Sequence, residues 1–161
     1  MGAISQILFG FVAAVLSGTQ RAIFGYGNSG SNTSITNLVS STGVVASDTA
    51  GVGTGRQGLA AAGYGSDKAI FGYGATSAYL SMTNLVSNTG VVATDTTGVG
   101  TARYGLAAAR YGTDKAIFGY GRDSNTTVTA ITNLVSNTGV VASNTTGVGT
   151  ARHELAAAGY G

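Results

Sequence analysis

Six side chains that could recognise a ligand recur at two fixed places in this sequence. They are Tyr26, Tyr73 and Tyr120 at one place, and Arg56, Arg103 and Arg152 at the other. A tyrosine ring can stack on a sugar while Asn and Ser side chains supply hydrogen bonds, and a repeated arginine can bind an anion. We favour a structural interpretation instead. In this interpretation, the arginines hydrogen-bond backbone carbonyls or Asp95 and so hold neighbouring repeats together. The tyrosines pack between the repeats.

Groups suited to catalysis or metal binding are sparse. The chain has no cysteine and one histidine, and the adjacent pair His153 and Glu154 occurs only in the last repeat. An enzyme acting through this pair is the least favoured alternative, because no spacing suggests a triad or a carboxylate pair. Each of several turns holds one acid or amide, which favours capping of the turn over calcium binding. These residues are Asp48, Asp95, Asn144, Asp67 and Asp114. We expect no catalytic residue, no metal and no cofactor.

These residues belong to a tandem array. Ile23, Ile70 and Ile117 recur every 47 residues, whereas Asn84 and Asn133 are 49 residues apart, so one loop holds two extra residues. We place the repeats at residues 12–58, 59–105 and 106–154 of a single domain, 1–161. Residues 1–20 hold the first strand, and 155–161 form a surplus strand. Such a period is typical of solenoids and propellers, whose units bury apolar faces only against neighbours.

Each unit is expected to be a meander of four short antiparallel strands. In the second unit we predict strands at residues 59–64, 68–73, 82–86 and 91–95, separated by segments rich in Gly, Ser, Asn and Asp. The run Leu-Ala-Ala-Ala could begin a helix, but Gly-Tyr-Gly interrupts it after about one turn. Four short strands in a unit of this length match one blade of a β-propeller. The sequence therefore predicts an all-β fold.

The unit also resembles the kelch repeat over nearly the whole chain. The resemblance rests on Arg103 before the alanine-rich run 106–109, on Gly119, Tyr120 and Gly121 at the end of the next strand, and on Thr132 and Asn133. Gly139 stands where kelch blades carry tryptophan, so the repeat is kelch-like. The resemblance implies propeller blades. Sequences with the Lys-Ala-Ile-Phe-Gly-Tyr-Gly run also resemble phage and other microbial environmental proteins.

The strands do not come in equal numbers. The alanine-rich strand occurs four times, beginning at Val12, Leu59, Leu106 and Leu155, whereas the other strands occur three times. Three blades are too few for a closed propeller, which has about four to eight. An open stack would leave exposed sheet edges, so we expect the chain to bind itself. The outcome is either a dimer forming a six-bladed ring or a head-to-tail fibre.

Composition limits the remaining functions. Charged residues make up 9% of the chain, against about 25% in soluble domains, and the net charge of +2 is spread along the repeats. Nucleic acid is therefore not an expected partner. The apolar stretch 7–16 is too short to span a membrane, and it aligns with the alanine-rich strand, with a cleaved signal as the alternative.

We expect a non-enzymatic structural or scaffold protein of a virion or extracellular surface, such as a fibre. Loops on a rigid scaffold usually carry recognition. The loops that differ between repeats, residues 28–35, 75–82 and 122–131, are therefore the expected recognition surface. The alternative is a carbohydrate-binding, lectin-like propeller whose partners are surface glycans.

Overall fold

The computed structural model describes residues 21–161, which contain ten short strands and no helix. The strands form small antiparallel sheets, so the predicted all-β class is confirmed. The strand expected near Val12 and the alternative of a cleaved signal concern residues outside the described range. Between residues 21 and 161, no helix is long and apolar enough to cross a membrane.

Each repeat contributes one main sheet. The first pairs β1 (Ala22–Gly25) with β2 (Thr36–Val39). The second has the order β3 (Ala60–Tyr64), β4 (Lys68–Gly72), β5 (Thr83–Val86). The third has the order β7 (Ala107–Tyr111), β8 (Lys115–Gly119), β10 (Thr132–Val135). A further small sheet, not expected from the sequence, joins β6 (Arg103–Tyr104) to β9 (Arg122–Asp123).

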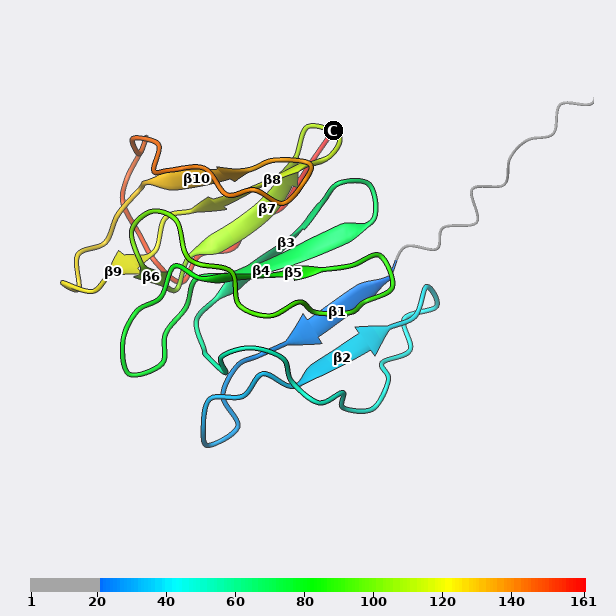
Figure 1. Ribbon diagram of the computed structural model, residues 1–161. Helices are drawn as coiled ribbons and strands as arrows, with labels where there is room; N and C mark the ends of the chain where they lie inside the picture. Colours follow the sequence, from blue (N-terminus) through cyan, green and yellow to red (C-terminus); the bar gives the residue numbers. More distant parts are fainter. Residues whose placement is uncertain (1–20) are drawn as a thin grey trace, which may run out of the picture.

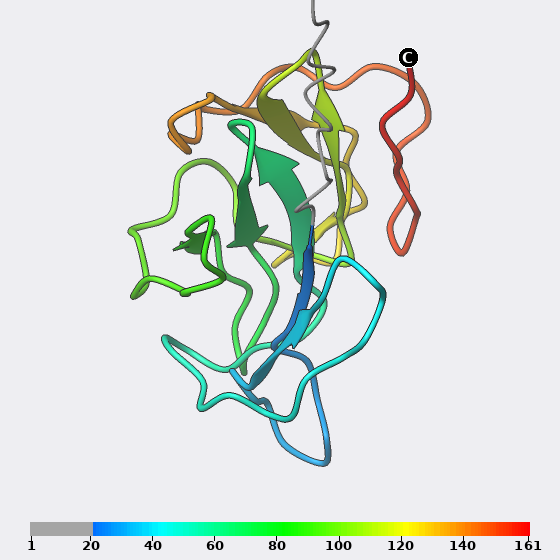
Figure 2. The same cartoon turned by 90° about the vertical axis from the view of Figure 1, so that its right-hand side faces the viewer.

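The three main sheets follow one another in chain order and do not close into a ring (Figure 1). Strand β3 packs against β7 and β8 of the next sheet without hydrogen-bonding to them. Figure 2 shows the C-terminal segment, in red, beside the third sheet. The predicted surplus strand lies in this segment, but residues 155–161 form no strand in the structure.

The core lies between the sheets. Strands β1, β4 and β8 share the sequence Ala-Ile-Phe-Gly, whose successive side chains point to opposite faces. Phe71 packs toward the first repeat with Tyr26, whereas Ile70 packs toward the third repeat with Phe118. Phe71 and Phe118 are 3% and 0% exposed, but Phe24 on the first sheet is 61% exposed. Burial is therefore decided by the neighbouring sheet.

The fourth predicted strand of each unit, residues 91–95 in the second, does not form as a strand. The segment and the residue after it make isolated bridges, between Val86 and Val92 and between Thr83 and Thr96, and the N–H of Ala93 donates to the Leu85 carbonyl at 2.8 Å. A side chain replaces part of the backbone ladder, because Nδ2 of Asn84 donates to the Ala93 carbonyl at 3.0 Å. The second and third sheets consequently have three regular strands where the sequence predicted four.

Glycine at the end of β4 is required by the close packing of the sheets. A Cβ atom at Gly72 would lie 2.6 Å from Cζ of Phe118, well inside van der Waals contact. Gly119 occupies the same place in the third sheet, where the nearest atom to an added Cβ is Cγ2 of Thr132 at 3.3 Å. The same residue is therefore tightly constrained in one repeat and far less so in the next.

We predict that Gly72→Ala lowers the free energy of unfolding by about 1–3 kcal/mol, because the added methyl pushes Phe118 out of its packed position. Gly119→Ala is the matched control and should change it by no more than about 1 kcal/mol. Urea denaturation of dilute protein measures both. Equal losses for the two variants would contradict the account of sheet packing.

Candidate functional site

Arg56 connects the first repeat to the second and is fully buried. Its guanidinium carbon lies 4.4 Å from the centroid of the Tyr26 ring, within cation–π range. Its Nε donates to the Tyr73 carbonyl and its Nη2 to Oδ1 of Asn84, both at 2.7 Å and both in the second repeat. Its Nη1 donates to the Thr54 carbonyl at 3.0 Å. Burial lowers the pKa of Arg56, but a guanidinium remains charged in proteins.

Arg103 makes the same connection between the second and third repeats. It is fully buried, and its guanidinium carbon lies 4.7 Å from the centroid of the Tyr73 ring. Nη1 donates to the carbonyls of Tyr120 at 3.0 Å and Ile131 at 2.7 Å, and Nη2 donates to Oδ1 of Asn133. The Nε of Arg103 has no partner among the described residues.

The three recurrent tyrosines adopt the left-handed backbone conformation, with φ of 64°, 65° and 64° for Tyr26, Tyr73 and Tyr120. This conformation is uncommon for a bulky residue and needs support from its surroundings. Part of this support is a hydrogen bond that each tyrosine hydroxyl donates to a backbone carbonyl of its own repeat at 3.0–3.1 Å. The acceptors are Val52, Val99 and Val148. Burial raises the pKa of both Tyr26 and Tyr73.

Two of the tyrosine rings are enclosed between repeats. Tyr26 meets Phe71 edge to face, and Tyr73 meets Phe118 in the same way, with ring centroids 5.1 Å apart in both pairs. An arginine covers each of these rings as well. Tyr73 is 0% exposed and Tyr26 is 8% exposed, so neither presents a ring face on which a sugar could stack.

The third member of the series lies at the surface. The guanidinium of Arg152 lies 4.5 Å from the centroid of the Tyr120 ring, and its Nη1 donates to the Thr150 carbonyl at 3.1 Å. Arg152 is exposed, unlike its two counterparts. Of the six candidate residues, four are therefore enclosed between repeats, and Tyr120 and Arg152 are not. Ligand binding by any of the six stays a prediction.

A recurrent acid or amide bonds back to the preceding repeat. Asp95 accepts from the backbone N–H of Thr54 at 3.0 Å, from Oγ1 of Thr54 at 2.7 Å and from Nδ2 of Asn84 at 2.9 Å. Asn144 replaces it in the third repeat and bonds to both polar groups of Thr101. Burial raises the pKa of Asp95, but the bonds from Thr54 and Asn84 and the charge of Arg56 outweigh it, so the net pKa is lowered.

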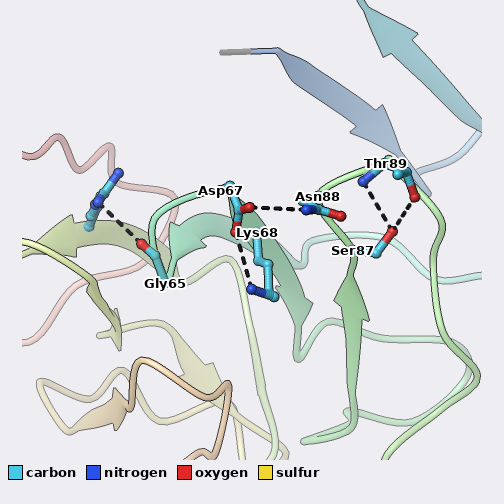
Figure 3. Close-up of polar contacts among 7 residues, drawn as sticks. Gly65, Asp67, Lys68, Ser87, Asn88 and Thr89 are labelled. Carbon is cyan, nitrogen blue, oxygen red and sulfur yellow. Dashed lines mark hydrogen bonds and ion pairs between the residues drawn. The ribbon is translucent and has the colours of Figure 1, made fainter. Parts of the chain in front are cut away.

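A second acid ties two turns of one repeat together (Figure 3). Asp67, in the turn between β3 and β4, contacts Nζ of Lys68 at 3.1 Å and accepts from Nδ2 of Asn88 at 3.1 Å. Asp114 and Asn137 repeat this bond at 2.9 Å. The bonds from Lys68 and Asn88 lower the pKa of Asp67. The carboxylates thus bond to turn residues, as the capping interpretation expects.

The loops that differ between repeats lie along one side of the stack (Figure 1). We call residues 28–35, 75–82 and 122–131 the loop edge. Neighbouring loops touch in series. Nδ2 of Asn32 donates to the Ala75 carbonyl at 3.5 Å, and Nε of Arg122 donates to the Tyr79 hydroxyl at 3.0 Å. The loop edge is therefore one connected surface.

Sequence reasoning missed one cluster at this edge. The rings of Tyr79 and Tyr104 stack with centroids 5.7 Å apart, and the guanidinium of Arg122 lies 5.9 Å from the centroid of Tyr104. Periodicity could not reveal the cluster, because Asn32 and Gln57 occupy the places of the two tyrosines in the first repeat. The signal that could have indicated the cluster was that Tyr79 and Tyr104 depart from the residues at the same places in the first repeat.

Among residues 21–161, no group of three or more His, Cys, Asp or Glu side chains gathers to hold a metal ion. No protein-family model and no curated protein matches this chain.

We predict that Arg103→Ala lowers the free energy of unfolding by about 3–5 kcal/mol. The substitution leaves Oδ1 of the buried Asn133 and the Tyr120 carbonyl without their donor, whereas the Ile131 carbonyl keeps the N–H of Tyr120. Arg152→Ala is the matched control at the exposed end and should cost less than about 0.5 kcal/mol. Urea denaturation of dilute protein compares them. A small loss for Arg103→Ala would show that the buried cation does not hold the repeats.

Asp95 should make stability depend on acid pH. Its pKa is lowered on folding from an ordinary value of 3.8, so its contribution is complete above about pH 4 and is lost as pH falls through the folded pKa. Asp95→Asn, which introduces the residue found at Asn144, should therefore lose less free energy of unfolding than the wild type between about pH 6 and about pH 3. Urea midpoints at both values measure the difference. Identical acid losses in the two proteins would contradict this role.

Proposed function

We propose that this chain is a non-enzymatic structural scaffold that displays variable loops at a virion or extracellular surface. The observation that carries the proposal is that the residues joining the repeats recur, whereas the loop residues vary. Recurrent residues such as Arg56, Tyr73 and Asn84 bond one repeat to the next, whereas the loop edge has a different sequence in every repeat. A scaffold requires this arrangement, because its loops can change without changing its packing.

The packing of the sheets supports a propeller-like arrangement of kelch-like blades. Small alanines of β3 and β7 lie where adjacent sheets pack, since Ala60, Ala62 and Ala108 border the larger core cluster. Adjacent blades of a propeller also pack face to face about a central channel. Three such sheets would form half of a six-bladed ring, and two copies would complete it.

Composition supports an external location. Only 9% of the residues are charged, and the chain has no cysteine that oxidation could modify. Neutral Ser, Thr and Asn side chains supply most of the exposed polarity of the loops. Fibres and surface layers are repetitive assemblies, and an array of nearly identical units suits them.

One observation favours the carbohydrate-binding alternative. Tyr79 and Tyr104 are only partly buried, and Arg122 lies beside them on the loop edge. Aromatic rings beside a polar side chain form a stacking platform for sugars. In a lectin-like protein this cluster, rather than the enclosed Tyr26 and Tyr73, would bind the glycan.

The test replaces loop 122–131 with the shorter loop 75–82 and compares both proteins by urea denaturation and on a glycan array. We expect the free energy of unfolding to change by no more than about 1 kcal/mol, because loop 75–82 makes the same backbone contacts at its two ends. Ala75 pairs with Gln57 where Arg122 pairs with Tyr104, and the Met82 carbonyl accepts from Tyr73 where the Ile131 carbonyl accepts from Tyr120. We also expect no reproducible glycan binding by the original chain.

Two results would contradict the scaffold. Unfolding of the loop-exchanged chain would show that the loops are part of the packing. Reproducible glycan binding that Tyr79→Ala abolishes, and that Tyr111→Ala as a surface control retains, would establish the lectin instead.

A further inference from the structure

The interface between repeats has a donor side and an acceptor side. The donor side of the second repeat is a continuous segment, residues 101–111. Thr101 and Arg103 bond into the third repeat, and then the segment enters the third sheet as β7, paired with β8. The acceptor side consists of the Tyr120 carbonyl, Asn133 and Asn144, with Phe118 inserted beneath the preceding tyrosine. The first and second repeats meet in the same way.

A third donor segment occurs at residues 150–160, which we call the donor end. Thr150, Arg152 and Leu155 correspond to Thr101, Arg103 and Leu106. Within the described part of the chain there is no sheet that residues 156–160 join as a strand. Among the described residues, the guanidinium of Arg152 donates only to the Thr150 carbonyl, and Tyr160 is fully exposed. The donor end therefore has the sequence of a sheet strand but joins none of the sheets that the structure describes.

The first sheet presents the complementary acceptor end, formed by β1, Phe24, Tyr26, Asn37 and Asp48. Among residues 21–161, β1 pairs only with β2, although β4 and β8 each pair on both edges. Phe24 is 61% exposed, and a shallow hollow beside it is lined by Tyr26, Asn37 and Asp48. Nδ2 of Asn37 donates to Asp48 at 2.8 Å, but its Oδ1 receives no donor from the described residues. Among the described residues, the acceptor end is therefore a sheet of two strands, where the second and third sheets have three.

We propose that the donor end of a second copy of this chain occupies the acceptor end, a contact that rests on the scaffold function proposed above. Arg152 of the second copy donates to the Tyr26 carbonyl and Oδ1 of Asn37, and Thr150 of the second copy donates to Asp48. Residues 156–160 of the second copy pair antiparallel with β1. The register follows from the pairing of Ala108 with Phe118, which places Ala157 of the second copy opposite Phe24.

Charge favours a second copy over the chain's own N-terminal segment as the source of the cation. Residues 1–20 contain no Lys or Arg, and Phe9 stands 47 residues before Arg56, where the repeat would place an arginine. Arg152 is an exposed cation, and the acceptor end carries the Asp48 carboxylate. The second copy therefore supplies the donor that this acceptor end requires. A closed pair of copies and an open fibre both contain this contact.

The decisive experiment mixes two variants that each have one end blocked. Arg152→Ala combined with Ala157→Pro blocks the donor end, since proline cannot donate to a strand ladder. Phe24→Lys blocks the acceptor end by placing an ammonium group where the contact would bury the Phe24 ring opposite Ala157. All three positions are exposed, so each variant should fold as the wild type does. Light scattering across a dilution series measures the mass of each protein.

We expect the wild type to associate, each variant alone to be monomeric, and an equal mixture to form a pair of exactly twofold mass. The mixture pairs because each variant retains the end that the other lacks. A monomeric wild type overturns the proposal, and so does a variant that associates alone or a mixture that remains monomeric. Association that appears only after deletion of residues 1–20 would assign the acceptor end to the chain's own N-terminal segment.

Cysteine cross-linking tests the register, because the natural chain has no cysteine. A chain with Phe24→Cys mixed with a chain carrying Ala157→Cys should form a covalent pair on oxidation, since directly opposite residues are within disulfide reach. Ala158→Cys, shifted by one residue, projects from the opposite face and should form little of this pair. Equal cross-linking by both would overturn the register. A monomeric chain that tolerates the loop exchange would retain the scaffold function and lose only this contact.

Discussion

A buried guanidinium between each pair of repeats is the interaction on which the structure depends. Arg56 and Arg103 are fully buried, stack on a tyrosine of one repeat and donate to oxygens of the next. A buried cation is costly unless its hydrogen bonds are made, so it constrains the groups around it. The left-handed Tyr73 is one such group, because its carbonyl accepts from Arg56 while its ring lies under Arg103.

The polar network also gives the stack a direction. Arginine and threonine donate from one repeat, and tyrosine carbonyl, asparagine and aspartate accept from the next. Asn84 shows how closely local and long-range structure are coupled, because its oxygen accepts from Arg56 while its nitrogen donates to Ala93 and Asp95. A repeat held in this way has two different faces. An assembly built by continuing the same contact is therefore head to tail.

Local sequence signals identified the described strands of the three main sheets, because these short runs are bounded by turn residues. They failed where a side chain competes with the backbone. Residues 91–95 have strand-forming composition, but the Asn84 amide takes the Ala93 carbonyl and Asp95 turns toward Thr54. The Tyr79, Tyr104 and Arg122 cluster was missed for a different reason, since residues from two segments meet there without following the repeat.

The sequence by itself determined an all-β array of three similar units, with recurrent Arg and Tyr residues as its shared polar elements. The sequence could not decide which of the equivalent residues in the three repeats are buried and which are exposed. Phe24 and Phe118 occupy equivalent places but differ in exposure, at 61% and 0%, and Arg152 is exposed whereas Arg103 is buried. Only the tertiary structure decides this difference. The interactions of each residue depend on whether another repeat, about 47 positions away, packs against it.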